Sequence, residues 1–199
     1  MTFKSEILKA VKSKAAQNPE WKFIYNKYYI RPETYCELII DPKWSFNGSP
    51  ASVLLQPAAG IYAPEIDEIY CKLSNSSPAR GLMFYIQLDH QELGRYRSQR
   101  VYAQDFESQD RAVSEVLRSM DCIFTAGENY LSKQFKFNSR EAFYASIPER
   151  TRGFGCIHYC IARGLLGDTD YIKSVLRKEI DPKGSQDLAL VGKILDYFS

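Results

Sequence analysis

The sequence lacks the long apolar segments that membrane and secreted proteins carry. No uninterrupted apolar run approaches the roughly 18 residues needed to span a bilayer. The amino-terminal segment has four lysines between positions 4 and 14 and no apolar stretch of signal-peptide length. We therefore expect a cytoplasmic protein without a membrane partner.

Strong net charge is also missing. The 199 residues carry 26 basic and 24 acidic side chains, a formal charge of +2. The overall charge therefore gives no electrostatic reason to expect nucleic acid as a partner. With 45% hydrophobic and 25% charged residues the composition is that of a globular protein. A chain of this length buries a core without the help of disulfides or a structural metal.

Cysteine and histidine are scarce. The cysteines are odd in number and lie within apolar segments, which favours buried, reduced thiols over a disulfide scaffold; they are Cys36, Cys71, Cys122, Cys156 and Cys160. Only two histidines are present, His90 and His158. This limits the acid–base arrangements that are open to an enzyme.

The first half of the chain alternates between one helix and several strands. Residues 3–17 place apolar side chains at helical spacing and lysines between them, which predicts an amphipathic helix that ends at Asn18-Pro19. We expect strands at about 22–30, 34–40, 52–62, 81–89 and 95–102, a turn at 44–50 and a short helix that starts at Pro64. The strand at 52–62 should be interrupted near Pro57 and Gly60, since proline cannot donate to a ladder.

The second half is helical. An apolar stripe that stays in phase predicts one long helix over 108–135, with Gly127 as the place where it can bend. Shorter helices are expected at 140–147, 154–165 and 169–179, the last capped by Asp168, and a final helix starts at Ser185.

Strands grouped before helices indicate an α+β fold rather than a doubly wound one. The expected architecture is an N-terminal helix, a four- to five-stranded, mainly antiparallel sheet and a C-terminal set of four to five helices. We expect one domain over 1–199, in which 140–199 is a candidate helical subdomain.

The residue types that support catalysis or metal binding do not converge. On a helix, positions two apart point in nearly opposite directions, so His158 faces away from Cys156 and Cys160. Two thiols alone also leave tetrahedral zinc two ligands short. Asp89-His90 suits acid–base work, but a polar exit from a strand explains the pair better. We expect no metal, no cofactor, no catalytic residue and no small-molecule substrate.

Charge is clustered locally although it sums to almost zero. Arginines at 95, 97 and 100 alternate with tyrosines, a pattern that grips nucleic acid through phosphates and stacked bases and that also fits a solvated edge strand. Acidic side chains gather over 105–128 and again at 65–68, which suits a basic partner protein. The candidate partner-binding residues are Glu65, Asp67, Glu68, Arg95, Tyr96, Arg97, Arg100, Asp105, Glu107 and Asp110.

The order of elements is similar to that of a known group of proteins. An aromatic strand pair with Tyr28-Tyr29, the segment Gly60-Ile61-Tyr62-Ala63-Pro64-Glu65, the strand at 81–89, the long helix and the terminal helices lie in that order. Together they resemble an uncharacterised bacterial family of small α+β domains that is associated with polymorphic-toxin immunity proteins. The tail beyond 140 is long for that family, and the near-neutral charge differs from that of many acidic nuclease inhibitors.

The resemblance implies a cytoplasmic immunity protein that neutralises a cognate bacterial toxin by direct 1:1 binding. Such an inhibitor needs no catalytic residue, and exposed tyrosines are the anchors to expect. Two other classes stay open. One is a small enzyme with a Cys/His or His/carboxylate site. The other is a nucleic-acid-binding accessory domain, although nucleic acid is not the partner that we expect.

Overall fold

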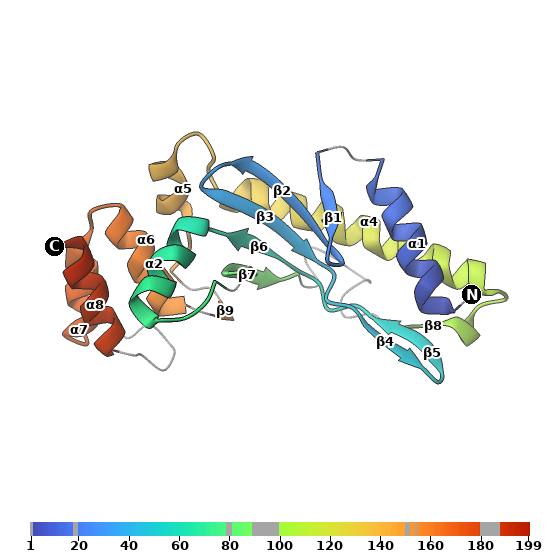
Figure 1. Ribbon diagram of the computed structural model, residues 1–199. Coiled ribbons are helices and arrows are strands. Elements are labelled where there is room, and N and C mark those ends of the chain that lie inside the picture. Colours follow the sequence, from blue (N-terminus) through green and yellow to red (C-terminus); the bar gives the residue numbers. More distant parts are fainter. Residues whose placement is uncertain are drawn as a thin grey trace. The chain divides into compact units, whose positions relative to one another are not determined.

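The computed structural model is an α+β protein, which confirms the predicted fold class (Figure 1). The structure describes residues 2–17, 20–78, 81–88, 100–149, 152–153, 155–179 and 188–199. The chain divides into two compact units. The first comprises Met1–Ile30, Leu38–Gly60 and Ile86–Leu131, and the second comprises Arg31–Glu37, Ile61–Tyr85 and Ser132–Ser199.

Two sheets are found among the described residues. The larger has the strand order β1-β2-β3-β6-β7-β9 and the smaller the order β4-β5-β8. The strands are β1 (Lys22–Ile24), β2 (Lys27–Glu33), β3 (Cys36–Asp41), β4 (Ser45–Gly48), β5 (Ala51–Leu54), β6 (Ala58–Tyr62), β7 (Phe84–Gln87), β8 (Arg100–Tyr102) and β9 (Arg152–Gly153). The pairs β1–β2, β4–β5, β5–β8 and β7–β9 are antiparallel.

Several predicted segments differ from the structure in their boundaries. The helix expected at 169–179 ends at Leu176, and the strand expected at 81–89 is β7 at Phe84–Gln87. The expected strand at 22–30 is a hairpin, because the chain reverses at Tyr25-Asn26 and pairs Ile24 with Lys27. The expected turn at 44–50 is mostly strand β4, and only Ser49-Pro50 forms the reversal. The strand expected at 52–62 is interrupted at Pro57, as predicted, because proline cannot donate to a ladder, and β5 and β6 are its two parts. At Gly60, the second expected interruption, β6 continues.

The opening helix, α1 (Phe3–Ala15), follows from its local sequence. Thr2 caps it by accepting a hydrogen bond from the amide of Ser5 at 3.3 Å. Its apolar face is buried in the first unit and consists of Phe3, Ile7, Val11 and Ala15. Lys12 and Lys14 in the last turn complement the helix dipole.

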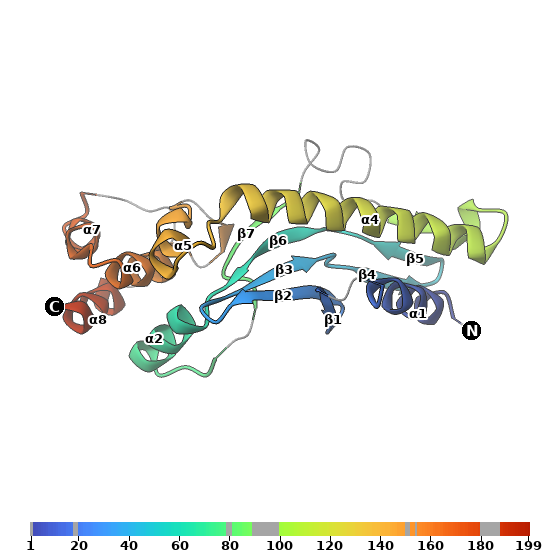
Figure 2. The same ribbon diagram turned by 90° about the horizontal axis from the view of Figure 1, so that it is seen from above.

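The long helix α4 (Gln109–Gln134) is uninterrupted across Gly127 (Figure 2). The short 3₁₀ helix η2 (Ala103–Asp105) precedes it. A Cβ atom at Gly127 would lie only 2.8 Å from Cγ1 of Ile40, so this glycine allows the helix backbone to approach β3 closely. Lys14 of α1 forms an ion pair with Asp121 of α4. In the first unit α4 thus contacts β3 at Gly127 and α1 through this ion pair.

The second unit contains the remaining helices. They are α2 (Pro64–Ser74), α5 (Arg140–Ser146), α6 (Gly155–Leu165), α7 (Thr169–Leu176) and α8 (Leu188–Phe198). Pro64 occupies the first turn of α2, as predicted, and Asp168 caps α7 by accepting a hydrogen bond from the amide of Tyr171. Ser185, the predicted cap of the last helix, lies outside the described residues. The fully buried side chains of this unit include Ile66, Phe143, Ile172 and Val191.

Candidate functional site

The acidic residues predicted on α2 are not equivalent in the structure. Glu68 is exposed. Asp67 is only 3% exposed, and its carboxylate accepts hydrogen bonds from the Tyr62 hydroxyl (2.7 Å) and the Cys71 thiol (3.7 Å). The burial removes Asp67 from the predicted acidic face, because a carboxylate bound to its own unit is not presented to a partner.

Glu65 is also held by its own unit. The Arg140 guanidinium donates to both of its carboxylate oxygens, through Nε at 3.0 Å and through Nη2, and the Tyr144 hydroxyl donates to Oε2 at 2.8 Å. Burial alone would raise the pKa of Glu65, but these hydrogen bonds and the charge of Arg140 together lower it. The Glu65 side chain therefore joins α2 to α5 and is already paired.

The predicted basic run is described only in part. Arg95, Tyr96 and Arg97 lie outside the described residues. Arg100 opens β8 in the first unit and is exposed, and its guanidinium lies 5.9 Å from the centre of the Tyr102 ring. Of the predicted basic run, the described residues therefore contain Arg100, which stacks on Tyr102 of the same strand.

The acidic residues that follow β8 are exposed. Asp105 ends η2, Glu107 lies in the connection to α4, and Asp110 is in the first turn of α4, where a carboxylate complements the helix dipole. Across the described part of the chain no ion pair involves any of these three residues. They form an acidic loop, a name used below for Asp105, Glu107 and Asp110, and they remain candidates for contact with a partner.

The buried histidine and thiols are placed as core residues. His158 is 4% exposed, and its ring lies 4.7 Å from that of Tyr70 and 6.5 Å from that of Phe84. Cys36 and Cys160 are buried as expected, whereas Cys71 and Cys122 are half-buried. Burial raises the pKa of the Cys36 thiol to about 12, so this cysteine is a poor nucleophile at neutral pH. The side chain of Cys156 and the Asp89-His90 pair lie outside the described residues.

The residues described contain no group of three or more histidine, cysteine or acidic side chains that could hold a metal ion. Their helices also include none with the length and apolar character that a membrane span requires.

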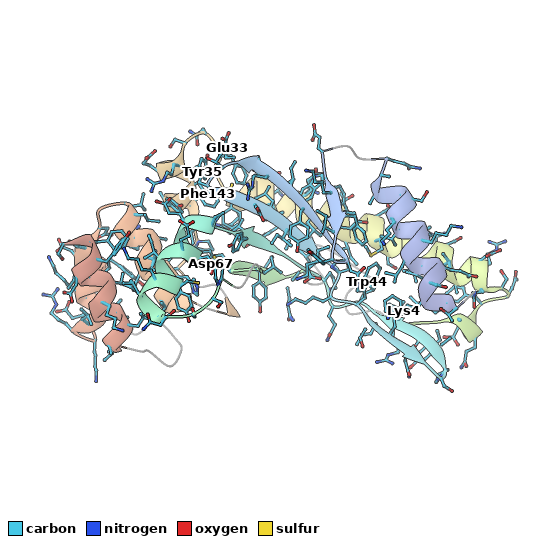
Figure 3. All side chains as sticks on the ribbon, viewed as in Figure 1. Lys4, Glu33, Tyr35, Trp44, Asp67 and Phe143 are labelled. Atoms are coloured by element: carbon cyan, nitrogen blue, oxygen red, sulfur yellow. The ribbon has the colours of Figure 1, made fainter. Side chains whose placement is uncertain are left out.

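A line of half-buried aromatic side chains distinguishes the first unit. The rings of Phe23 and Trp44 lie 6.0 Å apart edge to face, and those of Trp44 and Phe46 lie 5.6 Å apart. These three side chains are called the aromatic row below. The ammonium group of Lys4 lies 5.5 Å above the Phe46 ring at its end, so the row ends in a positive charge (Figure 3, where Lys4 and Trp44 are labelled).

The hairpin at the other end of the aromatic row exposes a tyrosine. Tyr25 is 87% exposed and the adjacent Ile24 is 43% exposed, which makes them two of the most exposed large apolar side chains described. Tyr25 and Asn26 have φ angles of 50° and 63°, so both occupy the left-handed region that a two-residue hairpin turn requires. Asparagine and glycine suit that region; a bulky residue does not.

Sequence reasoning missed this turn. The run Phe23-Ile24-Tyr25 continues the aromatic and β-branched pattern of a strand, and that pattern outweighs the single turn residue Asn26. The turn expected at 44–50 also includes Trp44, whereas in the structure its ring lies against that of Phe23. The signal that was available is Asn26 between two apolar segments, each of strand length.

Comparison with family models, curated proteins and solved structures gives no match for this chain. The candidate site therefore rests on the geometry described above.

Proposed function

We propose that this chain is an immunity protein that neutralises a cognate bacterial toxin by direct 1:1 binding. The observation that carries the proposal is Tyr25, an exposed aromatic side chain held at the tip of a hairpin by a left-handed backbone. Such a backbone costs a bulky residue roughly 1–3 kcal/mol. The Tyr25 ring is not part of the core of the first unit, and the turn does not require it. A contact with a partner protein therefore explains why a tyrosine occupies this position.

The neighbouring residues suit a protein interface. Tyrosine and tryptophan dominate interface hot spots, and arrangements with aromatic anchors inside a charged surround are typical of inhibitors. Ile24 and the aromatic row supply apolar surface, and Lys4 and the acidic loop supply charges of both signs within the same unit. The prediction of a protein partner rests on this combination.

The test co-expresses this chain with the product of the gene that neighbours its own, the candidate toxin, and measures growth. We expect cells that make both proteins to grow, and the purified proteins to form a 1:1 complex. Killing that continues in the presence of this chain, or the absence of a complex, overturns the proposal. Turnover of a small molecule by the purified chain favours the enzyme alternative instead.

Tyr25→Asn separates binding from folding. Asparagine suits the left-handed region, so thermal stability should stay the same or rise. Loss of the ring should cost about 2 kcal/mol of binding, or roughly 30-fold in Kd. Lys178→Asn is the matched control, because Lys178 is exposed with a φ of 59° at the end of α7 in the second unit. It should bind the toxin as the unmodified chain does.

A further inference from the structure

The outer edge of β4 has hydrogen-bonding groups that no described strand uses. β4 is the terminal strand of the smaller sheet, whose order is β4-β5-β8. Its register with β5 pairs Gly48 with Ala51, Asn47 with Ser52, Phe46 with Val53 and Ser45 with Leu54. Strand edges of this kind are templates for pairing with another chain.

The register tells which amides point outward. Gly48 and Ala51 flank the two-residue turn and so form a hydrogen-bonded pair, and such pairs alternate along an antiparallel ladder. Gly48 and Phe46 therefore direct their backbone groups to β5, while Asn47 and Ser45 direct theirs away from it. By the same alternation, Ser52 and Leu54 of β5 direct their backbone groups to Tyr102 and Arg100 of β8.

The edge is also accessible. Ser45, Asn47 and Gly48 are exposed, and a Cβ atom added at Gly48 would meet no atom within 4 Å. β4 contains no lysine or proline, the residues with which edge strands usually block pairing.

The edge is continuous with the candidate site. Phe46 is the middle of β4 and also a member of the aromatic row, and the Lys4 ammonium lies above its ring. A strand added to β4 would lie about 4.8 Å away and so within reach of that positive charge. An antiparallel second copy would instead place another Lys4 on the same face, and like charges oppose that pairing.

We propose that the toxin contributes an extended segment, with an acidic side chain near Lys4, that pairs with the outer edge of β4. The inference rests on the proposed function and adds its mode of recognition, in which main-chain hydrogen bonds give affinity and side chains give specificity. The outward groups of Ser45 and Asn47 make the bonds, and Phe46 and Lys4 select the segment.

Amide hydrogen exchange of the unmodified chain tests this pairing directly. In the free protein the amide of Phe46 should be protected by β5, and those of Ser45 and Asn47 should exchange rapidly. On binding the toxin, the amides of Ser45 and Asn47 should slow by at least about 10-fold. A bound, neutralised toxin that leaves these two amides fast overturns the strand pairing while the proposed function stands; absence of any complex overturns the proposed function.

Two pairs of variants complete the test. Ser45→Pro removes an outward N–H without breaking the β4–β5 ladder and should weaken toxin binding at least 10-fold, whereas Ser45→Ala should leave the Kd within about 2-fold. Lys4→Glu should weaken binding similarly, and Lys9→Glu on the same helix should not. Melting temperatures verify that each variant folds.

Sedimentation of the chain alone detects pairing between two copies. A dimer that pairs through β4 overturns the choice of the toxin as the occupant of this edge.

Discussion

The Tyr144 hydroxyl donates a hydrogen bond of 2.8 Å to Oε2 of Glu65. Tyr144 is 1% exposed and lies on α5, and Glu65 lies in the first turn of α2. Burial is the largest cause that raises the pKa of Tyr144, and the bond to Glu65 raises it further. The phenol therefore stays protonated and acts as a permanent donor within the second unit.

Tyr144→Phe should lower the free energy of unfolding by about 1.5 kcal/mol. This is the lower part of the range for a hydrogen bond to a charged group, because Glu65 is partly exposed. Tyr171→Phe is the matched control, since the Tyr171 hydroxyl donates to the exposed Glu149 at 3.2 Å, and it should change stability by less than about 0.5 kcal/mol. Urea denaturation measures both. Equal effects of the two variants would contradict the role of the Tyr144–Glu65 bond.

Stability should depend on the ionisation of Glu65 at acid pH. The pKa of this carboxyl is lowered in the folded chain from its ordinary value of 4.5, so the unfolded chain binds the proton more readily. The contribution to stability is present above the unfolded pKa and is lost as the pH falls through the folded one. Melting temperatures from about pH 6 down to about pH 3 should therefore converge for the unmodified chain and Glu65→Gln. A difference that stays constant over this range would exclude the linkage.

Gly127→Ala should destabilise the first unit. The new methyl group would meet the Ile40 side chain at 2.8 Å, and overpacking costs about 1–3 kcal/mol, which exceeds the gain of up to about 1 kcal/mol in helix propensity. Gly192→Ala in α8 is the control, because no atom lies within 4 Å of its added Cβ. That variant should be neutral or more stable. Calorimetric melting temperatures that rise for both would show that Ile40 yields without cost.

Asp168 should stabilise α7 in two separable ways. Its Oδ1 accepts a hydrogen bond from the Tyr171 amide at 3.1 Å, and its Oδ2 accepts one from Nε of Arg163 at 2.9 Å. Asp168→Ala removes both and should cost about 1–2 kcal/mol. Asp168→Asn keeps an oxygen that accepts from the Tyr171 amide but loses both the charge and the second oxygen, which accepts from Arg163. Because the cap remains, its cost should be smaller. Chemical denaturation compares the two, and a loss as large for asparagine as for alanine would assign the effect to the ion pair alone.

Helix positions followed closely from the sequence. The stripe that predicts 108–135 corresponds to α4 (Gln109–Gln134), and the prediction for 154–165 corresponds to α6 (Gly155–Leu165). Periodicity and capping are local properties, which a window of neighbouring residues contains. The hairpin at Tyr25-Asn26 was not predicted, because its strand-like residues outweigh one turn residue.

The charged candidates also differ in whether their surroundings follow from the local sequence or from tertiary contacts. Exposure of Asp105, Glu107 and Asp110 agrees with the polar character of their segment, whereas the pairing of Glu65 depends on Arg140, 75 positions away. The sequence alone does not distinguish a carboxylate that faces water from one that pairs with a guanidinium.

By itself the sequence determined the α+β class, the approximate positions of the described helices and the cap of α7, because these depend on interactions between residues within one or two turns of each other. Only the tertiary structure decided that Phe23, Trp44 and Phe46 form one row, that Tyr25 stands exposed beside it and that β4 has a free edge among the described residues. Strand pairing brings together residues that are distant along the chain, and only the completed sheet establishes which edges and side chains remain outside it.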